Sequence, residues 1–194
     1  MVLFLLGHVS GNFLIFGSPN AINDYAKSLR EIWPLLWVAR IGLIFFVSLH
    51  IYLTIKLALL NKKASPHKKR PTSSTTTSRY MVLSGLIVLS FICYHIAHLT
   101  LRWTHPEFNN LGEFDVRQML ILSFSSPWTT SFYLLSMVFI GAHLSHGVTS
   151  VFQTLGFGGR KYKLIYSSIG PIFGLITVLG FSVVPLSIFL GWLN

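Results

Sequence analysis

The sequence predicts an all-α membrane protein, a bundle of five transmembrane helices with the N-terminus in the cytoplasm. Hydrophobic residues make up 52% of the 194 residues and charged residues only 10%, and the mean hydropathy is +0.63. Such a chain is too apolar to cover a water-soluble globule. The apolar residues gather in five long runs, and the charged residues lie mostly between them. We expect one transmembrane domain over residues 1–194.

The composition also excludes other classes of protein. The net charge of +10 does not indicate nucleic-acid binding, because the basic residues lie in short segments between apolar runs rather than on one folded face. The single cysteine, Cys93, excludes an internal disulfide, a CxxC site and a cysteine-bound iron–sulfur cluster. It is expected to be a small buried apolar side chain.

The first apolar run is residues 1–16. It contains His8 and Asn12, and the first basic residue is Lys27, so the basic start of a signal peptide is missing. At ~1.5 Å per residue the run would be about 24 Å long, shorter than the ~30 Å hydrocarbon core. We expect a spanning helix that lacks its first turns. The second run begins after Pro34, which suits a helix start, and extends to about residue 60.

Residues 61–79 form the clearest break in composition, since they are rich in Lys, Arg, Ser and Thr. We expect a flexible linker there, with His67 solvated. The third run is residues 80–101. Residues 17–34 and 102–127 are expected to be polar connections.

The fourth run is residues 128–153, and a short basic turn, residues 154–163, leads to the fifth run, residues 164–193. The fifth run contains Pro171 and Pro185 and no histidine. Proline is tolerated inside spanning helices, usually with a kink.

The charges of the connections predict the orientation. The second and fourth connections hold nine Lys or Arg and no acid, whereas the first and third hold all five acidic residues of the chain. Because basic connections stay in the cytoplasm, the N-terminus is expected there and Asn194 outside. The expected location is the cytoplasmic membrane of a prokaryote.

Histidines lie deep in four of the five runs. A neutral imidazole in hydrocarbon needs a partner, because an unsatisfied polar group there costs several kcal/mol. Such histidines therefore indicate function. The residues are His8, His50, the pair His95 and His98, and the pair His143 and His146.

Counting along the helices sorts the histidines by depth. His50 and His143 each lie ten residues before the inner end of their helix, and His8 and His95 each lie nine residues before the outer end. A haem with two histidine ligands needs both at one level on facing helices. The sequence therefore predicts two b-type haems, the inner one bound by His50 and His143 and the outer one by His8 and His95.

Alternatives remain for these histidines. His98 and His146 are displaced by roughly 4.5 Å from their neighbours, and they could bond a haem propionate, line a quinone pocket or meet a backbone carbonyl. His105 is expected to be solvated. The histidines could also be ordinary bundle residues bonded to Ser or Thr on a neighbouring helix. They could instead belong to a zinc or copper carrier, although no run has an acid at its centre.

The chain resembles the cytochrome b membrane-anchor subunits of succinate dehydrogenase and fumarate reductase, in their five-helix, two-haem branch. The resemblance rests on the segments LLGHVSGN, VSLHIY, GLIVLSFICYHIAH and IGAHLSHGVTSVFQTLG, and on the fifth run without histidine. It assigns the haem ligands to the same four histidines that the depth count selects. Some members carry a glutamate in the fourth helix, but residues 136–145 contain no acid, so proton transfer through that group is not implied.

The resemblance further implies partners and substrates. A flavoprotein subunit and an iron–sulfur subunit would pass electrons to the inner haem, and the outer haem would pass them to a quinone near the outer surface. The chain would have no flavin site of its own. The soluble partners would dock on the cytoplasmic side, around residues 62–79 and 160–163.

Other candidate site residues follow from their depth and charge. Glu31, and then Asp24, are candidate acids for proton exchange at the quinone site. Arg40 and Arg102 could pair with propionates of the outer haem and Lys56 with one of the inner haem.

Two other functions fit the same residues. One is a dihaem cytochrome b of another enzyme, such as a hydrogenase or a formate dehydrogenase. The other is a non-redox membrane protein, either a metal carrier or an assembly scaffold.

Overall fold

The computed structural model describes residues 1–64, 73–112, 115–157 and 163–193. All the regular elements in these ranges are helical, so the predicted all-α class is confirmed. Contacts divide the chain into two compact units, Met1–Thr76 and Thr77–Asn194.

Four helices are long and apolar enough to cross a membrane: Trp33–Lys63, Tyr80–Thr100, Pro127–Gly156 and Ser167–Phe189. Val2–Phe16 is also apolar but shorter. Four of the five predicted runs therefore form helices of spanning length. The count of five spans and the side of the N-terminus stay predictions.

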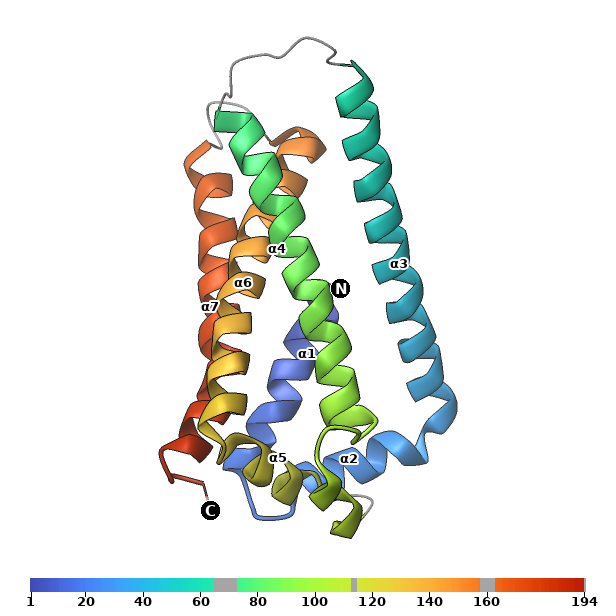
Figure 1. Ribbon diagram of the computed structural model, residues 1–194, viewed down its shortest axis with the longest axis vertical. Coiled ribbons are helices and arrows are strands. Elements are labelled where there is room, and N and C mark those ends of the chain that lie inside the picture. Colours follow the sequence, from blue (N-terminus) through green and yellow to red (C-terminus); the bar gives the residue numbers. More distant parts are fainter. Residues whose placement is uncertain (65–72, 113–114, 158–162, 194) are drawn as a thin grey trace. The chain divides into compact units, whose positions relative to one another are not determined.

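The N-terminal unit consists of α1, a 3-10 turn, α2 and α3 (Figure 1), with bounds Val2–Asn12, Phe13–Phe16, Ala21–Glu31 and Trp33–Ala64. The helix α2 lies in the predicted polar connection and was missed because its composition is mixed. Its apolar positions recur at helical spacing, and Ile22 among them is buried. Gly11 of α1 contacts α2, since a Cβ at Gly11 would lie 2.8 Å from Cε1 of Tyr25.

The helix α3 is longer than predicted. It contains Pro34 in its first turn and continues past residue 60 to Ala64. Lys62 and Lys63 lie in its last turn, where a positive charge is favourable next to the unpaired carbonyl groups. None of the residues in its most apolar stretch is buried. The side chains of this stretch therefore lie on the surface of the N-terminal unit.

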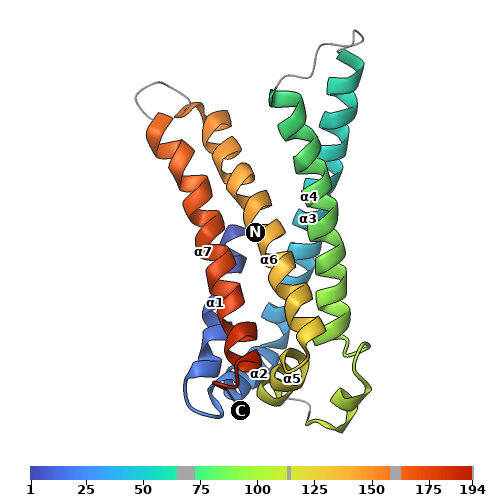
Figure 2. The same ribbon diagram turned by 60° about the vertical axis from the view of Figure 1, so that its left-hand side comes forward.

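The C-terminal unit contains α4, α5, α6 and α7 (Figures 1 and 2), with bounds Ser73–His95, Val116–Phe124, Pro127–Phe152 and Lys163–Phe189. A π-helical turn, Ile96–Thr100, extends α4, a 3-10 turn forms Pro106–Asn110, and another π-helical turn, Gln153–Phe157, follows α6.

The linker prediction for residues 61–79 is wrong at both ends. The chain is helical to Ala64 and again from Ser73. Ser and Thr are tolerated in the first turn of a helix, because a hydroxyl oxygen can accept a hydrogen bond from a backbone N–H that has no partner within the helix. Residues 65–72, with His67, and residues 158–162 lie outside the described residues.

The connection between the third and fourth runs is also partly helical, because it contains α5. Gln118 donates its backbone N–H to Oδ1 of Asp115 at 3.1 Å, which caps the start of α5. Met119 and Phe124 are buried, and Thr130 of α6 donates its hydroxyl to the carbonyl of Phe124 at 2.7 Å. The helix is therefore part of the core of this unit.

The helices α6 and α7 lie side by side (Figure 2), with small residues between them. A Cβ at Gly141 would lie 2.9 Å from the carbonyl oxygen of Gly174, and one at Gly174 would lie 3.1 Å from Cβ of Ser145. A Cβ at Gly170 would overlap the carbonyl oxygen of Ser145. Small residues let helix backbones approach closely, which is a main source of helix association in membranes.

Replacing Gly170 by alanine is expected to destabilise this unit by about 1–3 kcal/mol, the usual cost of overpacking. The new methyl group would meet backbone atoms of α6, which cannot move aside as a side chain can. The measurement is thermal unfolding of the purified protein in detergent, followed by size-exclusion chromatography. Gly147→Ala is the matched control, because nothing lies within 4 Å of a Cβ there. Equal loss of stability in both variants would contradict the packing described.

Candidate functional site

The helix α6 contacts neighbouring helices on two different faces. Gly141 and Ser145 face α7, whereas the residues that face α4 recur at helical spacing: Phe139, Ala142, His143 and His146. Successive residues are ~100° apart around a helix, so His143, two residues from both Gly141 and Ser145, points away from α7. The matching residues of α4 are Tyr80, Ser84 and Ile87.

His143 is fixed against the backbone of α4. Its Nδ1 lies 3.1 Å from the hydroxyl oxygen of Ser84, and a Cβ at Gly85 would lie 3.3 Å from its Cε1. Glycine at position 85 therefore leaves the space that the imidazole edge occupies.

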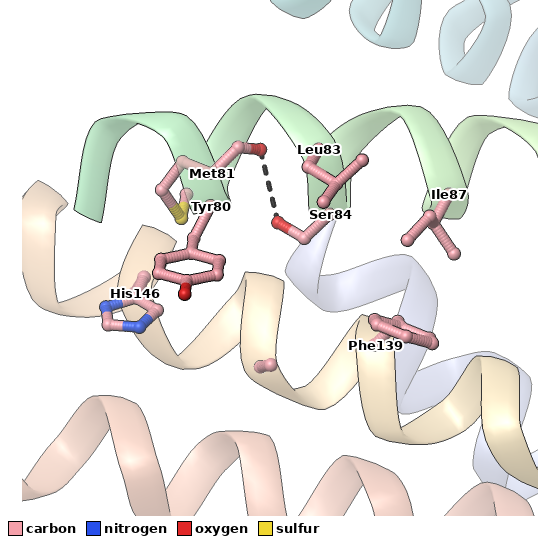
Figure 3. Close-up of a pocket in the computed structure, with 8 residues that line it drawn as sticks. Tyr80, Met81, Leu83, Ser84, Ile87, Phe139 and His146 are labelled. Carbon is pink, nitrogen blue, oxygen red and sulfur yellow. Dashed lines mark hydrogen bonds between the residues drawn. The ribbon is translucent and has the colours of Figure 1, made fainter. Parts of the chain in front are cut away.

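A pocket of about 240 Å³ lies between α4 and α6 in the half towards the N-terminal end of α4 (Figure 3). Its walls are mainly apolar, and the polar side chains that line it are Tyr80, Ser84 and the exposed His146. His146, one turn beyond His143, thus belongs to the pocket wall, whereas His143 contacts Ser84.

The other two histidines of this unit share a partner. The hydroxyl of Tyr133 lies 2.9 Å from Nδ1 of His98 and 3.4 Å from Nδ1 of His95. The side chain of His98 has 0% exposure. Its Nε2 is buried and has no hydrogen-bond partner among the described residues, a costly arrangement that indicates a role for this atom.

Aromatic rings enclose His98. Phe108 stacks on it at a centroid distance of 5.7 Å, and Tyr94 lies at 5.4 Å. The expectation that His105 is solvated is wrong, since it is half-buried with its ring 5.0 Å from His98 and 5.0 Å from Phe108. The 3-10 turn after His105 brings Phe108 back onto α4, and no periodic pattern of apolar residues indicates this return of the chain.

The expectation for Cys93 is also wrong, because the side chain is exposed. It lies on a face of α4 other than the one that carries Phe91 and His95, which pack with Tyr133. Apolar character in a spanning helix does not distinguish a lipid-facing residue from a buried one, because both contact hydrocarbon.

In the N-terminal unit, His8 is half-buried in α1 and stacks on Phe4 with a centroid distance of 5.3 Å. His50 lies exposed on α3. Both histidines are in apolar helices, as predicted.

The charged candidates of this unit also lie on α2 and α3. Arg40 lies 5.2 Å from the ring centre of Trp37, and Lys56 lies 5.8 Å from that of Tyr52. These contacts hold each charge beside an aromatic ring at one end of the apolar stretch.

The acidic candidates Asp24 and Glu31 are exposed on α2. Arg102 follows the π-helical end of α4, is half-buried and has a φ of 58°. This left-handed conformation, unusual for a residue other than glycine, turns the chain out of the helix.

Two residues that contact the histidines, Ser84 and Tyr133, were not predicted from the sequence. Both lie on the α4–α6 contact. Ser84 lies 11 residues before His95 on α4, close to three turns away on the same side, and this helical spacing is a signal that could have found it. No comparable spacing from a histidine of α6 indicates Tyr133.

The described residues contain no group of three or more His, Cys, Asp or Glu placed to hold a metal ion. Their imidazoles instead lie singly or in neighbouring pairs along apolar helices. A porphyrin iron takes two protein ligands at most, so it does not require such a group.

Helices that are apolar, long enough to cross a membrane and contain histidines indicate an integral membrane protein. Residues 58–183 match the family described as succinate dehydrogenase/fumarate reductase transmembrane subunit, and the chain belongs to this family. It is thus a membrane subunit of an enzyme complex. The match includes His95, His98, His143 and His146, whereas His8 and His50 precede it. No curated protein and no solved structure matches the chain.

Proposed function

We propose that the chain is the dihaem cytochrome b anchor of a succinate:quinone oxidoreductase. It would connect an iron–sulfur subunit to membrane quinone. The observation that carries the proposal is the family membership, together with histidines inside four apolar helices. In the C-terminal unit these histidines lie at two levels of the α4–α6 contact.

The residues present fit haem on two observations. Nε2 of His98 is a buried polar atom without a partner among the described residues, and Gly85 leaves room for the imidazole edge of His143, which a Cβ would crowd. We assign His50 and His143 to the inner haem and His8 and His95 to the outer haem. The haems supply one-electron transfer when bound.

The contacts of Tyr133 support His95 rather than His98 as the ligand. A tyrosine hydroxyl has one hydrogen, and the shorter contact, 2.9 Å, is to His98. If Tyr133 donates along it, Nδ1 of His98 is an acceptor and the proton of His98 is on Nε2, which then cannot bind iron. The tyrosine oxygen can accept Nδ1–H of His95 at 3.4 Å, which leaves the lone pair of His95 on Nε2.

His98 then has a different role, as a donor. Its Nε2–H would be a buried hydrogen-bond donor suited to a haem propionate or a quinone carbonyl. Arg40 and Arg102 would pair with propionates of the outer haem, and Lys56 with one of the inner haem.

Proton exchange at the quinone site is assigned to α2. Glu31 at the end of this helix is the first candidate, and Asp24 is the second. Both are exposed, so a carboxylate on this helix can exchange protons with water.

The proposed partners are a flavoprotein subunit and an iron–sulfur subunit in the cytoplasm of a prokaryote. Lys62 and Lys63 at the end of α3 begin the basic segment on which they would dock. The second basic segment, residues 160–163, is mostly outside the described residues.

The test is purification of the tagged chain in mild detergent from the membranes of its own host. We expect two larger soluble subunits to co-purify, one with flavin and one with iron–sulfur clusters. We also expect a reduced-minus-oxidised spectrum of low-spin b-type haem, with two haems per chain. An untagged strain is the control for the co-purification. A chain that carries no haem, or that co-purifies with subunits of a hydrogenase, would refute the proposal.

A further inference from the structure

We propose that Ser84 is a positioning residue for His143. Its hydroxyl fixes the imidazole as the tautomer with the proton on Nδ1, so that Nε2 keeps the lone pair for haem iron. The inference rests on the proposed function and deepens it, because it selects one ring nitrogen of one histidine.

A serine hydroxyl has a single hydrogen to donate. The Oγ of Ser84 lies 3.1 Å from the carbonyl oxygen of Met81, one turn earlier in α4 (Figure 3). A carbonyl oxygen can only accept, so this contact uses the hydroxyl hydrogen. Serine in a helix commonly donates back to the preceding turn in this way.

The oxygen of Ser84 can then act only as an acceptor towards other groups. Nδ1 of His143 lies 3.1 Å from it, so Nδ1 must carry the hydrogen and donate. A neutral imidazole has one N–H, and therefore the lone pair that can bind a metal is on Nε2. Neutral imidazole nitrogen in this form is the usual ligand of haem iron.

Geometry restricts the ring as well as its proton. The Cε1 edge of His143 lies over Gly85, where an added Cβ would be only 3.3 Å away, and the Nδ1 edge is held by Ser84. Ring rotation would break the hydrogen bond. His146, one turn further along α6, lines the pocket and is exposed.

The hydrogen bond also affects the iron. Donation from Nδ1–H makes the imidazole a more basic ligand, and a more basic ligand favours the oxidised, ferric form. Loss of the Ser84 hydroxyl is therefore expected to raise the reduction potential of the haem that His143 binds, and to leave that of the other haem unchanged.

The test compares three variants in the intact complex, Ser84→Ala, Ser84→Thr and Ser90→Ala. The measurements are a spectroscopic redox titration and electron paramagnetic resonance of the oxidised haems. Ser84→Thr keeps a hydroxyl. Ser90→Ala is the matched control, since Ser90 also donates its hydroxyl to the preceding turn of α4, to Leu86 at 2.9 Å, but is exposed.

We expect Ser84→Ala to raise one of the two haem potentials and to change the low-spin signal of that haem. Ser84→Thr should remain close to the unaltered protein, and Ser90→Ala should change neither haem. If Ser84→Ala loses haem, Ser84→Thr should retain it.

Unchanged potentials and signals in Ser84→Ala would overturn the inference, as would an equal effect of Ser90→Ala or an equal loss of haem in Ser84→Thr. These outcomes differ from failure of the proposed function, because that failure appears as absence of haem from the unaltered protein.

Discussion

Replacing His143 by alanine is expected to remove the inner haem, so that the purified complex keeps roughly half of its haem, because a b-type haem with two axial ligands is released when one is lost. The measurement is haem per chain from the pyridine haemochrome spectrum, with a redox titration to identify the haem that remains. Imidazole added during growth should restore part of the missing haem, since it can fill the space left by the side chain.

His146→Ala is the matched control for this prediction. The residue is one turn away on the same helix face and is also a histidine, but it lines the pocket instead of contacting Ser84. We expect two haems in this variant. Loss of haem in His146→Ala with retention in His143→Ala would exchange the roles of the two residues.

Replacing His95 by alanine is expected to remove the other haem, again leaving roughly half of the total. His98→Ala should keep both haems, because we assign His98 as a donor. It should nevertheless lower stability, since the Tyr133 hydroxyl loses its 2.9 Å contact in a buried site and an unsatisfied buried group costs about 1–3 kcal/mol.

Haem content and thermal unfolding of the two variants check this second prediction. The double variant His95→Ala/His143→Ala should contain no haem but should still be inserted in the membrane. Two haems in His95→Ala would show that the outer ligand is elsewhere, and His98 would be the next residue to test.

The sequence predicted the long helices because their apolar composition is set by contact with lipid and does not depend on neighbours. It missed α2 and α5 for the opposite reason. These short helices have mixed composition, and the burial of Phe124 depends on contacts with α6 that no local pattern contains. The linker ends at Ala64 and Ser73 were missed because Lys, Ser and Thr occur in helix ends as well as in linkers.

The candidate site was predicted to the level of residue type, and the pairing of the histidines by depth stays a prediction. The histidines were found because imidazole is rare and costly in hydrocarbon. Their partners Ser84 and Tyr133 were not found, because the register between α4 and α6 is a tertiary property. The alternative that bundle histidines bond a neighbouring serine describes His143 and Ser84 correctly, but an imidazole has two nitrogens, and a hydrogen bond through one leaves the other for a metal.

The close packing of α6 on α7 gives α7 a structural role although this helix contains no histidine. Gly141 and Ser145, which flank His143 in the sequence, interlock with Gly174 and Gly170. A shift of α6 along α7 by even one residue would bring backbone atoms of the two helices into steric overlap. If His143 is a haem ligand, as proposed, then α7 sets how deep in the membrane that ligand lies, and with it the level at which the inner haem would transfer electrons.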